Sequence, residues 1–517
     1  MSTAAQLRRD ALQIWRAGVD AVLPQRLVPQ YLRVEGESLL IGDDAIPLDA
    51  IGRIVVVGGG KAGGGMAEAV ETALGPKLME EKQVSGWINV PADCARPLQR
   101  IHLHAARPAG VNEPMAEGVA GAMEILRLVE SLRPSDLCLC LLSGGGSALM
   151  PAPVEGITLA DKLAITRHLS AAGANIEQLN AVRKQLSRIK EGGLLRACRA
   201  GRLVSLIISD VLGDPLDIIA SGPTVPDTLT PQAALDVLER FGALAANVAP
   251  AAIEYLERAC ATQQSFSRRV HASSEPGVDA GAKRESDIGT LRDEIGPKFV
   301  RNIILANNAT AVAAAAKEAK RLGYSVASGS ATHAEGPAEE IARDLVERAL
   351  KMRAGAGPRV GAAVQLPPQQ RPTCRRPLND SGGAPSCFIS GGEPVVKLVE
   401  SSRRGLGGRN QQLVLAALLR LRDDGADGIA LLSGGTDGED GPTDAAGALL
   451  DADVLAAARE KNLDPADFLA RNDAYHFFEP LAALVKTGPT QTNVCDVRVM
   501  LCGAKPQAAN AKPRAVV

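Results

Sequence analysis

The chain has 517 residues and a mass of 53.8 kDa, which exceeds one ordinary hydrophobic core and predicts two or three domains. Its 57 basic and 59 acidic side chains nearly cancel, and aromatic residues make up 3%, so neither a basic surface nor stacking platforms for nucleic acid are expected. No stretch approaches the roughly 18 apolar residues of a membrane span. The nine cysteines show no CxxC or framework spacing, which favours reduced thiols in a cytoplasmic protein. We therefore expect small-molecule partners rather than nucleic acid or a membrane.

The first half of the chain begins with a helix whose apolar residues recur at helical spacing, and strands and helices alternate after it. Alternation of this kind predicts an α/β fold with a Rossmann-like parallel sheet that helices cover on both faces. Ligands of such sheets bind beyond the carboxyl ends of the strands. We expect strands at residues 53–57, 84–90, 101–104, 137–142 and 203–208, with helices from Ala62, Glu113, Thr158 and Ile176.

Two polar segments without apolar periodicity divide the rest of the chain, and we interpret both as solvated insertions. Between them lies a strand–helix–strand pattern, and after them the alternation resumes with helices from Arg409, Ala452 and Pro465. This pattern predicts a second α/β domain. The expected organisation is an N-terminal domain at 1–260, an insertion at 261–299, a linking strand–helix–strand unit at 300–353, an insertion at 354–386 and a C-terminal domain at 387–517.

Four glycine-rich turns, each preceded by an apolar run, lie at residues 55–65, 137–148, 387–394 and 429–438. Glycine after a buried strand permits positive φ and close backbone approach, and the amides that begin the next helix attract anions. Strand-to-helix connections also use glycine for packing alone, so one such turn is ambiguous, whereas four favour a site for phosphates. The turns supply the predicted nucleotide- and phosphate-binding residues, which are Gly58, Gly59, Gly60, Ser143, Gly144, Gly145, Gly146, Ser147, Gly434, Gly435 and Thr436.

The first turn, GGGKAG at 58–63, formally matches the GxGxxG dinucleotide fingerprint, but the acidic residue expected after the next strand, VSGWINV, is missing. It is not a P-loop either, because Val55 and Ala62 stand where Gly and Ser or Thr are required. Lys61 places an ammonium beside backbone amides, which suits a triphosphate, although a solvated turn lysine is the alternative. The second turn lacks the final glycine of a GxSxG elbow around Ser147, which disfavours a serine hydrolase.

Charged residues follow other predicted strands and turns. Asp210 and Asp214 come directly after a strand, where Asp can ligate Mg²⁺ or accept a hydroxyl proton, although Asp before Gly or Pro is also common turn chemistry. Arg409 and Asn410 begin a helix, which places a guanidinium suited to a carboxylate or phosphate at a helix N-terminus. Asp437 lies in a glycine loop that holds three carboxylates, and this density favours a site.

Long, ordered segments together resemble the class II glycerate kinases, whose C-terminal half contains the MOFRL domain. The resemblance covers nearly the whole chain outside the two insertions. One departure is the segment HAARP at 104–108, which stands in place of the family's usual Gly-His-Pro stretch. The matching segments are VGGGKAGGGMA (57–67), LLSGGGSALMPAP (141–153), LNAVRKQLSRIKEGGL (179–194), SDVLGDPLDIIASGPT (209–224), SGGEP (390–394), GLGGRNQQLVLAAL (405–418), LLSGGTDGEDGPTDAAGA (431–448) and TGPTQTNVCD (487–496).

The resemblance implies phosphorylation of D-glycerate by ATP with Mg²⁺, and it favours O2 and therefore 2-phosphoglycerate as product. Lys61 and Arg409 match the lysine and arginine regarded as catalytic in the family. Because they lie in different predicted domains, we expect an active site in the interdomain cleft of a monomer or homodimer. The assigned roles are catalysis by Lys61, Arg409, Asp210 and Asp437, metal binding by Asp210, Asp214 and Asp437, and substrate binding by Arg183 and Asn410.

Two other functions stay open on the sequence. A nicotinamide-dependent hydroxypyruvate reductase would act on the same metabolite pair, but the missing ribose-binding acid argues against it. A nucleotide-binding sensor without catalytic activity is the other alternative, and the presence of both Lys61 and Arg409 argues against that.

Overall fold

The structure, a computed structural model, describes residues 3–111, 113–226, 229–272, 297–354 and 385–503. The chain divides into two compact units, and the prediction of two α/β domains is confirmed. We call residues 24–305 the N-terminal unit, and residues 1–23 together with 306–517 the C-terminal unit. This division differs from the predicted domains, because the first helix joins the C-terminal unit and the boundary lies at 305 rather than 260.

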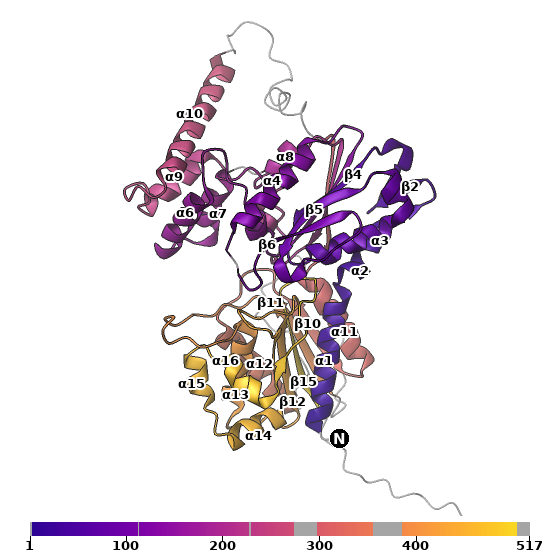
Figure 1. The fold of residues 1–517 in the computed structure, drawn as a ribbon. Coiled ribbons are helices and arrows are strands. Elements are labelled where there is room, and N and C mark those ends of the chain that lie inside the picture. The colour runs from indigo at the N-terminus through magenta and orange to yellow at the C-terminus, as the bar shows by residue number, and fades with distance from the viewer. Residues whose placement is uncertain (1–2, 112, 227–228, 273–296, 355–384, 504–517) are drawn as a thin grey trace, which may run out of the picture. The chain divides into compact units, whose positions relative to one another are not determined.

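The N-terminal unit is built on a six-stranded sheet in the order β6-β5-β4-β7-β8-β9 (Figure 1). The pairs from β6 through β8 are all parallel. Counted along the chain, this is the Rossmann order 3-2-1-4-5-6, whose ligand crevice lies where the order reverses, here between β4 and β7. The strands are β4 (Ile54–Gly59), β5 (Ser85–Pro91), β6 (Ile101–Arg107), β7 (Leu137–Ser143), β8 (Arg202–Ile208) and β9 (Phe299–Ala306).

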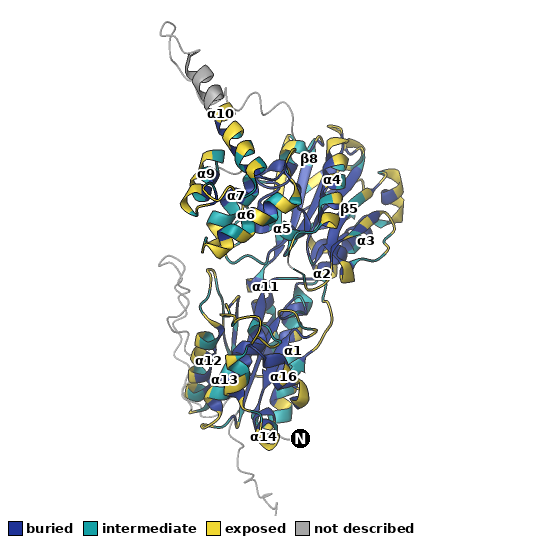
Figure 2. Ribbon diagram, turned by 60° about the vertical axis from the view of Figure 1, so that its left-hand side comes forward, coloured by how far each residue is buried: buried dark blue, intermediate teal, exposed yellow. Residues whose placement is uncertain are grey.

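The two central strands are buried along their whole length, as their unbroken apolar runs predict (Figure 2). Helix α4 (Ala116–Glu130) packs against one face, which Val55, Val57, Cys138 and Cys140 present. The remaining helices around this sheet are α3 (Gly63–Glu81), which is kinked at Gly75 and contacts β4, β5 and β7, and the short α5 (Gly146–Leu149) and α8 (Gly193–Ala197).

A helical layer with its own apolar cluster completes the N-terminal unit. Thr158 and Asn175 form capping boxes at the starts of two of its helices, where the sequence predicts helices from Thr158 and Ile176. The last helix continues into the predicted insertion as far as Ala272, and residues 273–296 lie outside the described residues. These helices are α6 (Leu159–Ala171), α7 (Ile176–Gln185), α9 (Pro231–Arg240) and α10 (Pro250–Ala272).

The start of the N-terminal unit contains a small sheet that the sequence analysis did not anticipate. Its three short strands form an antiparallel meander. Strands of four residues with one buried face give only a weak alternating pattern, which explains why they were missed. The segment comprises α2 (Pro24–Tyr31), β1 (Leu32–Glu35), β2 (Ser38–Ile41) and β3 (Asp44–Pro47).

The C-terminal unit contains a second six-stranded sheet, in the order β10-β11-β15-β12-β13-β14. Only β10 and β11 are paired in parallel, and β15 runs antiparallel to both of its neighbours. The predicted second insertion falls almost entirely on residues 355–384, which lie outside the described residues. The strands are β10 (Ser325–Ser330), β11 (Ser386–Gly392), β12 (Ile429–Gly435), β13 (Gly447–Leu450), β14 (Leu484–Val485) and β15 (Asp496–Cys502).

The N-terminal helix α1 (Thr3–Ala21) is part of this second unit and contacts α11, β12 and β15 (Figure 1). Its Trp15 is buried, and its Arg8 pairs with the buried Asp451 at 2.7 Å. Other helices cover the opposite face through an apolar cluster that includes Phe477 and Phe478. Helix α11 (Asn308–Arg321) packs beside α1. The helices that contribute to the cluster on the opposite face are α12 (Ala338–Arg353), α13 (Arg409–Leu421), α14 (Ala452–Glu460), α15 (Pro465–Ala470) and α16 (Ala474–Phe478).

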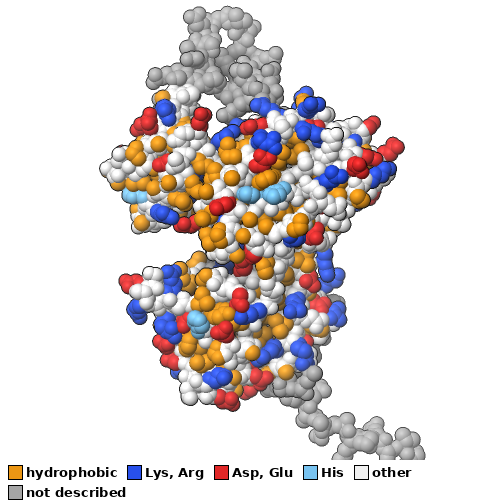
Figure 3. Space-filling view, viewed as in Figure 1, with side chains coloured by type: hydrophobic (Ala, Val, Ile, Leu, Met, Phe, Trp, Pro, Cys, Tyr) orange, Lys and Arg blue, Asp and Glu red, His pale blue; other side chains and the backbone are white. Residues whose placement is uncertain are grey.

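The surface carries side chains of both charges, and the described cysteines are free thiols, as the composition predicts. Basic and acidic side chains alternate over the visible face of each unit (Figure 3). Among the described residues, eight cysteines carry free thiols and all eight are buried. Within the same residues, every helix is too short or too polar to cross a lipid bilayer.

Candidate active site

The first two glycine turns lie side by side at the point where the strand order of the N-terminal sheet reverses. Strands β4 and β7 pair in parallel, with Gly58 opposite Leu141 and Gly59 opposite Leu142. The turns that follow these strands therefore meet at one edge of the sheet. This edge is the place where the Rossmann order predicts a ligand crevice.

The glycines of the first turn are required by close packing. Gly58 and Gly60 have φ values of 141° and 150°, and a Cβ at Gly60 would lie 2.1 Å from Ser143 Oγ. The amide of Lys61 donates to Gly144 O at 2.8 Å, and the amide of Ala62 donates to Ser143 Oγ at 3.0 Å. These bonds tie the two turns together. They support a packing role for the first turn, and its predicted contact with phosphates stays a prediction.

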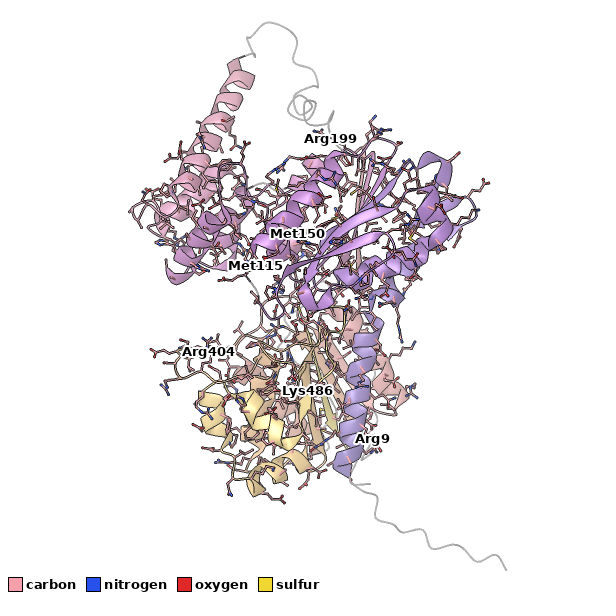
Figure 4. The ribbon with its side chains drawn as sticks, in the orientation of Figure 1. Arg9, Met115, Met150, Arg199, Arg404 and Lys486 are labelled. Atoms are coloured by element: carbon pink, nitrogen blue, oxygen red, sulfur yellow. The ribbon has the colours of Figure 1, made fainter. Side chains whose placement is uncertain are left out.

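The second turn leaves room for about a methyl group beside two cationic side chains. Gly145 has a φ of 79°, and a Cβ there would lie 3.4 Å from the guanidinium of Arg107 and 3.6 Å from Cγ of Lys61. Arg107 ends β6 and is buried, and sequence reasoning recorded it only as part of a departure from the family. Met150, labelled in Figure 4, follows this turn, and its side chain packs beside Gly59. The side chains of Lys61 and Arg107 therefore both lie next to Gly145.

Ser147 is the centre of a hydrogen-bonded cluster at the same turn. Lys190 Nζ donates to Ser147 Oγ at 2.7 Å, and an Arg183 NH2 group donates to it at 3.4 Å. The hydroxyl of Ser221 shares a 2.9 Å hydrogen bond with Ser147. The predicted residues Ser147 and Arg183 are thus brought together. Lys190 and Ser221 were missed as site residues, although both lie inside motifs shared with the family.

The loops that carry Lys190 and Ser221 hold an unusual backbone. Glu191 and Ser221 have φ values of 56° and 66°, in the left-handed region that non-glycine residues rarely adopt. The amide of Glu191 donates to Ser221 O at 3.0 Å, and the amide of Gly192 donates to Gly222 O at 2.7 Å. Backbone strain of this kind persists where surrounding structure fixes it and concentrates at functional sites.

Several cationic side chains are buried close together in this cluster. Lys162, Lys184 and Lys190 are all buried. Burial, then the charges of Arg183, Lys162 and Lys184, hold the pKa of Lys190 well below its usual range, and burial with Arg183 lowers the pKa of Lys162 to about 7. Lys184 forms an ion pair with Asp217 at 3.8 Å. A group of like charges such as this favours binding of an anion.

The carboxylates assigned to magnesium follow β8 on the same sheet. Ile208 pairs with Ser143, so Asp210 and Asp214 follow β8 at the edge where Ser147 lies. Among the described residues, no group of three His, Cys, Asp or Glu side chains is arranged to hold a metal. Mg²⁺ is commonly bound through one or two carboxylates together with substrate phosphates, and a pair of aspartates fits that mode. Their assignment as ligands stays a prediction.

In the C-terminal unit, Arg409 is fixed at the start of α13 by two carboxylates. Its Nε and NH2 groups bind the two oxygens of the buried Asp496 at 2.7 and 3.0 Å, and its NH1 group binds Glu393 at 2.8 Å. Burial by itself lowers the pKa of Arg409, but Asp496 and then Glu393 outweigh it and raise that pKa. Burial also raises the pKa of Glu393, and the charges of Asp496 and Asp437 add to this effect while Arg409 opposes it. The guanidinium is therefore oriented but already neutralised.

Asn410, the other predicted substrate residue in this unit, is fully buried. Its amide and that of Gln411 donate to the two oxygens of Asp440 at 3.0 and 2.8 Å, so Asp440 caps α13 from a distant loop. Burial raises the pKa of Asp440 to about 7. Ser433 Oγ donates to Asn410 Oδ1 at 2.5 Å. These bonds give Asn410 a role in the fold, and its contact with substrate stays a prediction.

The glycine turn after β12 is also explained largely by packing. Gly434 O accepts a hydrogen bond from Trp15 Nε1 at 3.2 Å, and a Cβ at Gly434 would lie 3.0 Å from that nitrogen. Thr436 Oγ1 donates to Cys495 O at 2.7 Å and accepts from the Val494 amide at 2.8 Å. Asp437, in the same turn, contributes to the raised pKa of Glu393, which is one of the two carboxylates bound to Arg409.

Comparison with known proteins identifies the class of this two-unit α/β protein. Residues 10–257 match a family described as a domain of unknown function, DUF4147, and residues 386–496 match the MOFRL family. The chain is 36% identical to glycerate kinase of Homo sapiens over 535 residues, covering 97% of this chain and 94% of that protein. It is 32% identical to D-glycerate 2-kinase of Thermotoga maritima over 498 residues, covering 96% and 98%.

Two further similarities complete the comparison. A protein of Agrobacterium vitis named putative hydroxypyruvate reductase is 35% identical over 458 residues, covering 88% of this chain and all of that protein. The crystal structure of glycerate kinase from Thermotoga maritima superimposes with a TM-score of 0.67 at 29% identity, covering 96% of this chain and 100% of that chain. The chain belongs to the glycerate kinase family, in which a DUF4147 domain is joined to a MOFRL domain. The resemblance stated from the motifs is therefore confirmed.

Proposed function

We propose that this protein transfers the γ-phosphoryl group of ATP, bound with Mg²⁺, to the O2 hydroxyl of D-glycerate. The observation that supports this most directly is the cationic cluster around Ser147 at the switch point of the N-terminal sheet. Phosphoryl transfer depends on positioning and on neutralisation of charge more than on covalent chemistry. Relatives named glycerate kinase and D-glycerate 2-kinase support the substrate and the position.

The site residues of the N-terminal unit have different roles in this proposal, which their surroundings determine. Lys61 and Arg107 flank the space at Gly145, where they are suited to bind anionic oxygens of ATP or glycerate. Arg183 extends the positive charge to Ser147, and Lys190 contacts the same hydroxyl from the buried side. Magnesium, when bound, neutralises phosphate oxygens, and Asp210 and Asp214 are the residues that would hold it.

Arg409 has a different part in this proposal. Asp496 and Glu393 hold its guanidinium in one orientation and use three of its five N–H groups. The remaining N–H groups on NH1 and NH2 are suited to donate to a substrate oxygen from a fixed position. Asp437 stands beside this arrangement, where its carboxylate is suited to a cation that accompanies the nucleotide. The active site expected between the two predicted domains stays a prediction.

One assay tests both the activity and the position of transfer. The protein is incubated with ATP, Mg²⁺ and D-glycerate, and the product is given to enolase alone. We expect phosphoenolpyruvate to form directly, because enolase accepts 2-phosphoglycerate. Formation only after a phosphoglycerate mutase is added would assign O3 instead, and consumption of ATP independent of glycerate would exclude the proposed substrate.

A nicotinamide-dependent reductase is the second candidate, which the Rossmann strand order and the name of one relative favour. Two structural observations oppose it. The strand β5 ends in Asn89, Val90 and Pro91, without the carboxylate that binds a nicotinamide ribose. The amides of Lys61 and Ala62, which a pyrophosphate would require, donate within the protein. Oxidation of NADH with hydroxypyruvate would establish this activity, and we expect none.

Partners and location follow the proposed activity. The expected partners are ATP and D-glycerate, and the expected compartment is the cytoplasm. Both a monomer and a homodimer fit the proposal, because each residue used in it belongs to one chain.

A further inference from the structure

Lys190 is buried behind Ser147, and a lysine that only neutralises the charge of a substrate does not need such a position. Ser147 is partly exposed, whereas Lys190 is 3% exposed behind it, and Nζ lies 2.7 Å from Oγ. A substrate in the crevice therefore reaches the lysine through the serine hydroxyl. A lysine that served only to attract an anion would gain from direct contact with it.

We propose that Ser147 accepts the proton of the attacking glycerate hydroxyl while its own hydroxyl proton passes to Lys190. Ser147 is then a catalytic residue, and Lys190 is a positioning residue that holds the proton until product leaves. This inference rests on the proposed function and identifies the proton acceptor within it.

The step balances in atoms and charge. The O–H bond of glycerate breaks, its proton moves to Ser147 Oγ, and the serine proton moves to Lys190 Nζ, which becomes an ammonium. The glycerate oxygen forms a bond to the γ-phosphorus as the bond from that phosphorus to the ADP oxygen breaks, and ADP leaves with the electron pair. The ammonium returns its proton to Ser147, and the excess proton passes to solvent after release of phosphoglycerate.

The hydrogen bonds of Ser147 suit this relay. Without substrate, its oxygen accepts from Arg183 at 3.4 Å and shares a bond with the Ser221 hydroxyl at 2.9 Å. In the proposed complex the glycerate hydroxyl replaces the long bond from Arg183, so that one lone pair of Ser147 receives the proton. A charged Lys190 donates to Ser147 Oγ, as described above. When Lys190 is the neutral amine and Ser221 donates to Ser147, the Ser147 hydrogen points at Lys190 Nζ instead, across the same 2.7 Å. The left-handed backbone at Ser221 and its bond to the Glu191 amide fix this arrangement from both loops.

The charged groups around Lys190 favour its neutral amine, which can accept a proton. Arg183 and Lys184 face it from α7, and Lys162 faces it from α6. Burial and these three charges lower the pKa of Lys190. Two carboxylates stand nearby with other partners: Glu191 accepts from Gln185 Nε2 at 2.7 Å, and Asp217 lies 3.8 Å from Lys184. Arrival of an anionic substrate opposes the surrounding positive charge and therefore raises the proton affinity of Lys190 in the complex.

Substitution of Lys190 by arginine distinguishes two possible roles of this lysine, acceptance of a proton and provision of a fixed positive charge. Arginine keeps the charge but does not deprotonate in proteins, so it cannot accept the proton. We expect Lys190→Arg and Ser147→Ala each to lower kcat by about 10²-fold or more, with KM for glycerate changed only a few-fold. The double variant Ser147→Ala with Lys190→Met should lose no more than the single variants, since the two groups act as one unit. A Lys190→Arg enzyme that keeps more than about a tenth of kcat would overturn the inference.

The pH profile of kcat gives a second readout that does not depend on Lys190 being replaced. We expect a fall in kcat on the acid side as Lys190 becomes protonated, and Lys162→Met should move this fall to higher pH by about half a unit, because one neighbouring positive charge is lost. Thermal melting of each variant shows that it is folded. If Lys190→Arg fails to fold, the Lys162→Met profile decides, and an unmoved acid limb overturns the inference.

The two proposals fail in different ways. An active wild type with an active Lys190→Arg variant overturns the proton relay and leaves the kinase. A wild type that does not phosphorylate glycerate overturns the proposed function, and the relay with it.

Discussion

The two units hold buried charge of opposite sign. In the N-terminal unit, Arg183 and buried lysines surround Ser147, and burial with like charges lowers the pKa of Lys190. In the C-terminal unit, carboxylates surround Arg409, and burial with like charges raises the pKa of Glu393. The same physical cause, desolvation next to like charge, acts on bases in one region and on acids in the other. The surroundings of Ser147 therefore favour an anion, whereas the surroundings of Glu393 favour a cation or a hydrogen-bond donor beside that carboxylate.

The glycine turns of the two units differ as well. The turns at β4 and β7 bring Lys61, Arg107 and Ser147 to one edge of a sheet. The turn at β12 receives the indole of Trp15 from α1. Similar glycine-rich sequences thus serve a crevice in one unit and the docking of a helix in the other.

The largest expected effect is on the turnover of variants at Lys61 and Arg409, the two cations assigned to catalysis. We expect Lys61→Met and Arg409→Ala each to lower kcat by about 10³-fold, because both remove positive charge from the transition state. Only Arg409→Ala should also destabilise its unit, by about 3–5 kcal/mol, since it leaves the buried Asp496 unpaired. Steady-state kinetics and denaturant unfolding measure the two effects.

A second variant separates the two effects at Arg409. Adding Asp496→Asn to Arg409→Ala removes the unpaired charge, so stability should recover in large part while kcat stays low. Near-normal turnover in Lys61→Met or in Arg409→Ala would contradict the assignment. Each unit contains one of the two tryptophans, Trp87 in the N-terminal unit and Trp15 in the C-terminal unit, so unfolding of each unit can be followed by its own fluorescence.

The next effect concerns the buried lysines of the N-terminal unit. The pKa of Lys162 is about 7 in the fold against an ordinary value of 10.5, so the unfolded chain binds more protons between these pH values. Stability conferred through Lys162 should therefore rise from pH 7 to pH 10.5, by about 5 kcal/mol. Lys162→Met removes this dependence, which Trp87 fluorescence in a Trp15→Phe background measures. If the free energy of unfolding changes equally with pH in the wild type and in Lys162→Met, Lys162 is charged in the folded state.

The C-terminal unit should show the opposite slope through Asp440. Its pKa is about 7 in the fold against an ordinary 3.8, so the folded state binds more protons in this window and stability falls as pH rises through it. We expect a loss of about 4 kcal/mol relative to Asp440→Asn between these pH values. Trp15 fluorescence in a Trp87→Phe background measures it. A parallel pH dependence of wild type and variant would contradict the raised pKa.

The smallest expected effect lies at the contact between α1 and the turn after β12. Trp15→Phe keeps an apolar ring but loses the 3.2 Å hydrogen bond to Gly434 O, which should cost about 1 kcal/mol. The loss should be confined to the C-terminal unit. Trp87 fluorescence serves as the internal control, and an equal shift of the Trp87 transition would show that α1 stabilises the N-terminal unit instead.

Much of the fold was predictable from local pattern. The strands β4, β7 and β12 were expected because buried strands require unbroken apolar runs, and α13 was expected from Arg409. Lys61 and Ser147 were predicted as site residues because both lie in turns that follow such strands. Lys190 and Ser221 were not, since 43 and 74 residues separate them from Ser147 and no short motif joins them.

The sequence by itself determined the two α/β domains, the place of the glycine turns and the family, because periodicity and long motifs are properties of neighbouring residues. Only the tertiary structure decided which charges meet. It placed Lys190 behind Ser147, paired Arg409 with Asp496 and joined α1 to the C-terminal sheet. These outcomes depend on burial and on contacts between distant segments, and the same lysine or arginine in water would have an ordinary pKa and no fixed partner.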